Sequence, residues 1–138
     1  MIEKTTVELT DNHEFRIAGD TACSDLNPKA LLLAAAAKCS GLTAMMLMER
    51  MRVTPKRLEI TYSGELNTEQ VQAESIFRSF HAVYNVECGA GDQQEKASRA
   101  LTLTHEKYCG MTQMLHKIAP VSHEIAIVST EPETTAVK

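Results

Sequence analysis

The chain has 138 residues, which is enough for one domain and too few for two separate cores. Its 43% apolar content is typical of globular proteins, and no unbroken apolar run reaches the roughly 18 residues of a membrane span, so we expect no membrane contact. A net charge of −4, with three Phe, three Tyr and no Trp, offers nucleic acid neither an attractive field nor a stacking platform. The N-terminus lacks a signal-peptide pattern, which predicts a cytoplasmic protein.

The first part of the chain predicts a hairpin followed by a long helix. Apolar and polar residues alternate over 7–9 and again over 15–17, with turn-forming residues between them, as in a β-hairpin. Asn27 and Pro28 are the residue types that begin a helix, as N-cap and first helical residue. From Leu31 to Met51 the helix is apolar on nearly every side, which is typical of a helix in the middle of a domain or a dimer.

The second part predicts two strands, two helices and a final strand from alternating and then helical periodicity. In chain order their bounds are Arg57–Glu65, Glu74–Val86, Gln93–Tyr108, Met111–Ile118 and Val121–Ile127. The order β-β-α-β-β-α-α-β, with a long apolar central helix, indicates an α+β fold. We expect a single domain over residues 1–129 and a frayed C-terminal tail over residues 130–138.

Four cysteines lie at positions 23, 39, 88 and 109, and none forms a Cys-x-x-Cys motif, so a zinc knuckle or thioredoxin-type site is not expected. Cys39 lies in the apolar helix, where a free cysteine is usually a small core residue. A second interpretation is that Lys38 beside it favours the thiolate. The residues alone favour the first interpretation.

Cys109 lies where one predicted helix ends and the next begins. The free N–H groups and positive dipole end of the second helix would lower its pKa, whereas the alternative is that Cys109 only fills a corner between helices. His105 would share a helix face with Cys109 if the first helix continued. The histidines lack partners at metal-binding spacing, so we expect no metal site.

Taken together, the segments Asn27–Gly41 and Glu106–Met111 resemble the two cysteine motifs of the OsmC/Ohr family, the osmotically inducible and organic hydroperoxide resistance proteins. The likeness extends over most of the chain, through the strand order and the closing segment Val121–Ile125. The run Glu106-Lys107-Tyr108-Cys109 is similar to the OsmC-like branch of this family. The resemblance implies an intertwined homodimer, with the apolar helices at its centre and two active sites at the subunit interface.

The resemblance also implies peroxiredoxin-like chemistry. In active members the first cysteine, here Cys39, attacks the peroxide oxygen as a thiolate and becomes a sulfenic acid. The second, here Cys109, condenses with it to a disulfide, and an external dithiol such as dihydrolipoamide reduces the pair. No bound cofactor is implied. An apolar pocket formed by helix residues would favour organic hydroperoxides over hydrogen peroxide.

The sequence departs from the family's pattern in charge. Active members carry a glutamate ten residues before the first cysteine, where it holds a catalytic arginine, and here this position is Lys29. On a straight helix Lys29 lies roughly 15 Å from Cys39. The family's arginine comes from the N-terminal strands, where Arg16 is available. Arg16, Lys29 and Lys38 are therefore the candidates for stabilising a thiolate.

Three functional hypotheses remain. The cysteine pair favours a two-cysteine reductase of organic hydroperoxides, acting in oxidative stress defence. Lys29 favours a non-peroxidase dimer of the same fold that binds, or exchanges thiols with, a small apolar or sulfur-containing ligand. In the third hypothesis all four cysteines only fill space in the core or on the surface.

Overall fold

A computed structural model describes residues 1–129, so the tail predicted to be frayed, 130–138, lies outside the described residues. The helices and strands follow the predicted order. They are β1 (Ile2–Leu9), β2 (Phe15–Ile17), the 3-10 turn η1 (Cys23–Asp25), α1 (Pro28–Arg50), β3 (Arg57–Leu66), β4 (Phe77–Cys88), α2 (Asp92–Leu103), the π-helical turn η2 (Thr104–Tyr108), α3 (Gly110–His116) and β5 (Val121–Ser129).

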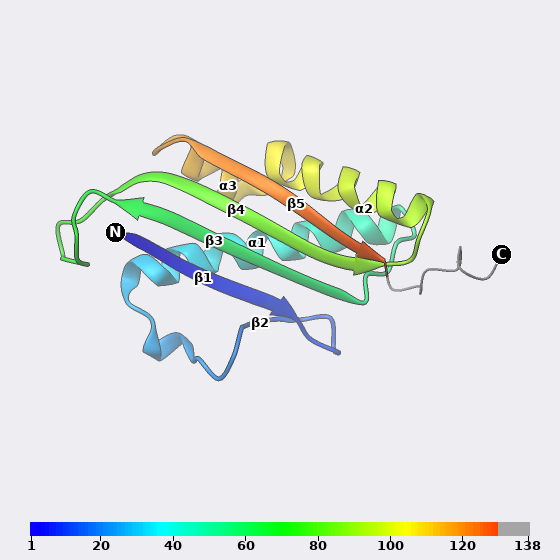
Figure 1. Ribbon diagram of the computed structural model, residues 1–138, viewed down its shortest axis with the longest axis horizontal. Helices are drawn as coiled ribbons and strands as arrows, with labels where there is room; N and C mark the ends of the chain where they lie inside the picture. The colour runs from blue at the N-terminus through cyan, green and yellow to red at the C-terminus, as the bar shows by residue number, and fades with distance from the viewer. Residues whose placement is uncertain (130–138) are drawn as a thin grey trace.

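The five strands form one sheet in the order β2-β1-β3-β4-β5, and the helices cover one of its faces (Figure 1). Neighbouring strands are antiparallel except β4 and β5, which run parallel. A parallel pair needs a long crossover connection, and α2, η2 and α3 supply it. The predicted α+β class is confirmed. The parallel pair was not predicted, because the element order alone does not fix where β5 joins the sheet.

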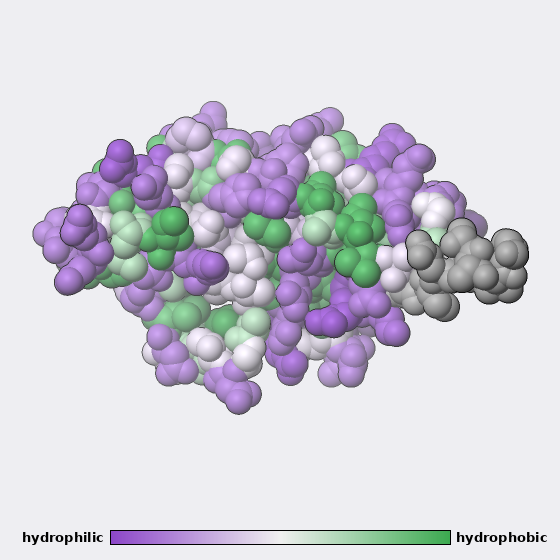
Figure 2. Space-filling model, viewed as in Figure 1, coloured by the Kyte–Doolittle hydropathy of each residue, from purple (hydrophilic) through white to green (hydrophobic). Residues whose placement is uncertain are grey.

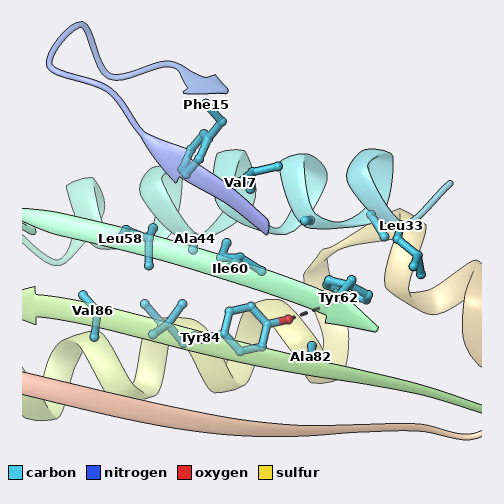
Figure 3. Close-up of a cluster of buried hydrophobic side chains, with 14 of the residues drawn as sticks. Val7, Phe15, Leu33, Ala44, Leu58, Ile60, Tyr62, Ala82, Tyr84 and Val86 are labelled. Atoms are coloured by element: carbon cyan, nitrogen blue, oxygen red, sulfur yellow. Dashed lines mark hydrogen bonds between the residues drawn. The ribbon is translucent and has the colours of Figure 1, made fainter. Parts of the chain in front are cut away.

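The core lies between the sheet and the helices. Along β3 and β4 every second residue is buried, among them Ile60, Tyr62 and Tyr84. Figure 3 shows these side chains together with Leu33 and Ala44 of α1. The face of the sheet away from the helices carries mostly hydrophilic side chains (Figure 2). The alternation therefore fixes which face of the sheet receives the helices.

The helix α1 begins as the sequence predicts. Asn27 is its N-cap, and the Asn27 side chain accepts a hydrogen bond from the Ala30 N–H at 2.9 Å. One side of α1 packs on the sheet, while the opposite side exposes apolar residues. The large ones are Leu31, Leu42 and Met46. One long side of this central helix is therefore not covered by its own chain.

By length and composition α1 is also long and apolar enough to cross a membrane, although Lys29 and Lys38 interrupt its apolar run. Half of the apolar stretch is buried inside the protein, and the core helix of a soluble protein has the same features. The helix therefore gives only weak evidence for a membrane span.

One local prediction was wrong, and one short turn was not predicted. The fourth strand begins at Phe77 and not at Glu74, because Asn67 closes the preceding loop by accepting a hydrogen bond from the Ile76 N–H at 3.0 Å. The polar stretch 19–25 contains the short turn η1, in which Asp25 accepts a bond from the Ala22 N–H at 3.1 Å. Both features come from side chains that hold nearby backbone, which periodicity does not reveal.

The contact between α1 and β2 predicts a sharp packing limit at Gly41. A methyl group there would lie 2.6 Å from the nearest atom of the Phe15 ring, so Gly41→Ala should lower the free energy of unfolding by about 1–3 kcal/mol in urea titrations. Gly110→Ala is the matched control, because nothing lies within 4 Å of a methyl group there. Equal stability of the two variants would contradict this packing.

Candidate functional site

Cys39 and Cys109, seventy residues apart in the sequence, come together where α1 packs against α3. Cys109 lies close enough to Cys39 to raise its pKa. Ser40, the next residue along α1, donates a hydrogen bond to the Cys109 Sγ at 3.3 Å. Cys39 is partly exposed and Cys109 is fully buried, and both are free thiols. The site thus pairs one accessible sulfur with one inaccessible sulfur.

A break in the helices places Cys109 at this point. The turn η2 has the wider π-helical spacing, and the Cys109 N–H donates to the Thr104 carbonyl at 2.9 Å to close it. Cys109 itself is extended, with φ −81° and ψ 109°, and forms the N-cap of α3. The predicted helix junction is therefore present.

The first turn of α3 acts on Cys39, whereas the sequence predicts that its free N–H groups act on Cys109. The backbone N–H of Met111 and the hydroxyl of Thr43 both lower the pKa of Cys39. Burial raises this pKa by more, and the Cys109 side chain adds to the increase, so the pKa lies above its ordinary value. In a single chain Cys39 is therefore a thiol with donors placed to stabilise its thiolate.

The three candidate cations lie elsewhere. The Lys29 Nζ donates to the Gln72 carbonyl at 3.0 Å, and the Arg16 Nε pairs with the Glu8 carboxylate at 3.2 Å. Arg16 and Lys38 line a groove of about 420 Å³ between β2 and α1. Within the described chain none of the three is among the groups that set the pKa of Cys39. The suggested effect of Lys38 on this thiol stays a prediction, and on a helix the side chains of adjacent residues point in different directions.

A chain of buried hydroxyl groups extends from the cysteine pair into the core. The Ser40 hydroxyl lies 3.2 Å from the Tyr62 hydroxyl, and Thr112 hydrogen-bonds to both. The Tyr62 and Tyr84 hydroxyls are 3.5 Å apart (Figure 3), and the Tyr84 hydroxyl lies 2.8 Å from the His105 Nδ1. A continuous polar path therefore connects Cys109 with a buried histidine.

His105 has an unusual environment. It is 2% exposed, and its Nε2 has no hydrogen bond within 3.5 Å among the described residues, although the Val121 backbone lies close enough to raise the pKa of the ring. Its ring stacks on His123 at 4.1 Å, with His116 at 6.0 Å. Burial, followed by the charges of these two histidines, lowers the pKa of His105 to about 4, so the ring is neutral near pH 7.

No sequence motif marks these polar residues as functional. Tyr62 and Tyr84 were identified only as members of alternating strands, and they approach because the register pairs Tyr62 with Ala82 and Tyr84 with Ile60. This diagonal relation places both hydroxyls on the helix side. The only sequence feature that points to this network is the position of Ser40 next to Cys39. In the described part of the chain no group of three His, Cys, Asp or Glu side chains could hold a metal ion.

The comparisons with known proteins agree with this architecture. The sequence model described as OsmC-like protein matches residues 19–124. Protein YhfA of Escherichia coli is 24% identical over 122 residues, covering 88% of each chain.

Two solved structures show the same fold. A hypothetical protein from Aquifex aeolicus is 20% identical, with a TM-score of 0.65 over 95% of this chain and 97% of that one. An OsmC-like hydroperoxide resistance protein from Jannaschia sp. is 17% identical, with a TM-score of 0.56 over 83% of this chain and 85% of that one. The predicted fold is therefore confirmed.

The lowered pKa of His105 predicts a pH-dependent stability. In the unfolded chain His105 binds a proton below its ordinary pKa of 6.5, whereas in the folded chain it binds one only below a pKa of about 4. The free energy of unfolding therefore falls as the pH drops from 6.5 to 4. From about pH 7 to about pH 5 this ring should lower the free energy of unfolding by about 2 kcal/mol.

Urea titrations at the two pH values measure this effect. In His105→Gln the decrease in unfolding free energy between pH 7 and pH 5 should be smaller by about 2 kcal/mol. In His13→Asn, which changes an exposed histidine in the β1–β2 turn, the decrease should equal that of wild type. An unchanged loss in His105→Gln would contradict the assignment to this ring.

Proposed function

The chain belongs to the OsmC-like protein family, and we propose on this basis that it is a peroxiredoxin-like thiol peroxidase that reduces organic hydroperoxides. The observation that carries the proposal is the meeting of Cys39 and Cys109, one partly exposed and one buried, at the start of α3. A peroxide can reach the Cys39 sulfur, and the Cys109 sulfur lies beside it. The likeness in fold to the hydroperoxide resistance protein supports the same assignment.

The reaction follows from this arrangement. The Cys39 thiolate attacks the terminal oxygen of the hydroperoxide, the O–O bond breaks, and the alcohol leaves after taking up a proton. The Met111 N–H and the Thr43 hydroxyl stabilise the thiolate before the attack. Cys109 then attacks the resulting sulfenic acid, water leaves, and a disulfide forms. An external dithiol, such as dihydrolipoamide, returns both sulfurs to thiols.

The surroundings of Cys39 favour an organic substrate. On α1 the exposed positions one turn before and after it are Ala35 and Leu42, and the Leu42 side chain is 51% exposed. An alkyl or aryl group of a hydroperoxide can cover this surface, whereas hydrogen peroxide cannot. Organic hydroperoxides should therefore bind more tightly than hydrogen peroxide, because they remove more apolar area from water.

A homodimer is part of the proposal. The uncovered side of α1 exposes Leu31, Leu42 and Met46 along one line of the central helix. Apolar side chains gathered on an exposed helix face are typical of an interface, and a second copy of α1 would cover them. The same contact would place each Cys39 next to the partner chain. Free thiols fit a reducing compartment, so we place the protein in the cytoplasm.

One observation favours a second function. The pKa of Cys39 is raised, and Lys29, at the position of the family's glutamate, bonds to the Gln72 carbonyl instead. Peroxide reduction and thiol exchange both need the thiolate, so a raised pKa slows each of them. The second function is therefore binding of a small apolar or sulfur-containing ligand, with slow thiol exchange. The following assay separates the two functions.

Peroxide consumption by the reduced protein tests the proposal. With cumene hydroperoxide and dihydrolipoamide, wild type and Cys23→Ser should consume peroxide equally, because Cys23 lies on the exposed turn η1. Cys39→Ser should fall to the rate without protein. Cys109→Ser, given one equivalent of peroxide without the dithiol, should stop as a Cys39 sulfenic acid, which mass spectrometry detects. Equal consumption by wild type and Cys39→Ser would contradict the peroxidase. The second function would be established if the reduced wild type consumes no peroxide but, with a small disulfide in place of the peroxide and the dithiol, forms a Cys39 mixed disulfide and releases the other half as a thiol.

Mass measurement by light scattering after gel filtration tests the dimer. The wild type should have the mass of two chains, and Leu42→Glu should have the mass of one, because it places a charge on the uncovered side of α1. Ile76→Glu is the control, since this side chain is 63% exposed and lies outside α1. A monomeric wild type would contradict the dimer.

A further inference from the structure

Ser40 is the member of the buried hydroxyl chain that touches a cysteine sulfur. Its hydroxyl donates to the Cys109 Sγ at 3.3 Å, and among the described residues no other N–H or O–H group donates to this sulfur. Ser40 and Cys109 are both 0% exposed, so within a single chain water cannot take the place of the hydroxyl. The polar environment of the Cys109 sulfur therefore depends on one side chain.

The direction of this hydrogen bond decides what Ser40 can do. An O–H group that donates to a sulfur stabilises the negative charge of a thiolate, and across the same contact it cannot take up the proton of a thiol. The Cys109 proton must therefore leave on the other side, toward Cys39, which is partly exposed. The thiolate is the attacking form of a cysteine, and burial disfavours it. Ser40 thus favours the form of Cys109 that burial opposes.

The neighbours of Ser40 hold its hydroxyl in place. The Ser40 oxygen lies 3.2 Å from the Tyr62 hydroxyl and 3.3 Å from the Thr112 hydroxyl. Burial raises the pKa of Tyr62, and a charge on Cys109 raises it further, so Tyr62 keeps its proton when Cys109 ionises. A negative charge therefore stays on the sulfur, next to the one donor aimed at it.

The helix α1 carries both the donor and the target of Cys109. Ser40 directly follows Cys39, and the side chains of adjacent helix residues point in different directions. Cys39 therefore reaches the surface while Ser40 is buried in the core, and both lie next to Cys109. The hydrogen bond from Ser40 thus holds the Cys109 sulfur beside the sulfur that it would attack.

We propose that Ser40 is a catalytic residue of the resolving step, in which its hydroxyl stabilises the Cys109 thiolate that attacks the Cys39 sulfenic acid. Tyr62 and Thr112 are positioning residues that act through Ser40. The proposal rests on the peroxidase function and adds to it the group that activates the resolving sulfur.

The resolving step balances without a proton passing through Ser40. The Cys109 thiol loses its proton to water at the open side of Cys39. An electron pair of the thiolate forms the S–S bond to Cys39, the S–O bond of the sulfenic acid breaks, and hydroxide leaves and takes a proton from water. The Ser40 hydroxyl keeps its own proton throughout. The sum is one disulfide and one water from one sulfenic acid and one thiol.

Loss of the Ser40 donor should have opposite effects at neutral and at high pH. A hydrogen bond to a charged group changes its population by about tenfold, so near pH 7 Ser40→Ala should hold about tenfold less thiolate. Each remaining thiolate should attack about threefold faster, because nucleophilicity follows about half of a change in basicity. The rate of disulfide formation should therefore be about threefold below wild type near pH 7, and about threefold above it at about pH 10.5, where both proteins are ionised at Cys109.

A single-turnover experiment measures this ratio. Reduced protein receives one equivalent of cumene hydroperoxide, and mass spectrometry of quenched, alkylated samples follows the Cys39 sulfenic acid and the Cys39–Cys109 disulfide separately at each pH. The rate of disulfide formation in Ser40→Ala, divided by that of wild type, should rise through one as the pH increases. Ser63→Ala is the matched control, because the Ser63 hydroxyl donates to the His81 carbonyl at 3.3 Å, away from both cysteines, and its ratio should stay at one.

A second pair of variants applies if Ser40→Ala does not fold. Ser40→Thr and Ser40→Val have nearly the same shape and differ in the hydroxyl. The threonine variant should follow the wild-type pH profile, and the valine variant should show the crossing expected for a lost donor. A role of position 40 in packing alone would change both variants alike.

Three results would overturn the proposal. A ratio of one at every pH would mean that Ser40 does not act on the Cys109 sulfur, and a lowered ratio that does not change with pH would mean that Ser40 only shapes the site. Both results leave the peroxidase intact, since the sulfenic acid still forms. Absence of any Cys39 sulfenic acid in wild type would overturn the role of Ser40 and the peroxidase together.

Discussion

The packing of α1 against the start of α3 is the interaction on which the whole site depends. It brings Cys39 beside Cys109, gives Cys39 the Met111 N–H and gives Cys109 the Ser40 hydroxyl. The π-helical turn η2 makes this contact possible, because it ends the preceding helix and lets Cys109 turn its side chain inward. The sheet supplies the other wall through Tyr62 and Tyr84. The site is thus built from the core and not from surface loops.

Burial and hydrogen bonding oppose each other at this site. Burial raises the pKa of Cys39 and lowers that of His105, so both groups are neutral in a single chain near pH 7. The Met111 N–H and the Thr43 hydroxyl stabilise the Cys39 thiolate, so their effect is felt when Cys39 loses its proton. The proposed peroxidase therefore depends on a thiolate that is a minor state of Cys39 in a single chain.

The sequence determines most of the fold through local signals. Asn27 and Pro28 mark the start of α1, and the alternation in 57–65 and 74–86 indicates the two central strands correctly, apart from the first residues of β4. Local sequence signals do not predict the site. Nothing in a window of sequence relates Cys39 to Cys109, and only the family resemblance paired them. The Tyr62–Tyr84–His105 path depends on strand register and on a buried ring, which are long-range properties. The locations of the Arg16 and Lys29 side chains depend on their partners in the fold.

The central claim, that Cys39 and Cys109 act as one redox pair, is tested most directly by a redox titration of the protein with Cys23 and Cys88 changed to serine. Equilibration in buffers of oxidised and reduced dithiothreitol, followed by thiol counting, should show both remaining thiols disappearing in one two-electron transition within a single chain. Two thiols that persist at the oxidising end, or disulfides that form only between chains, would contradict the account.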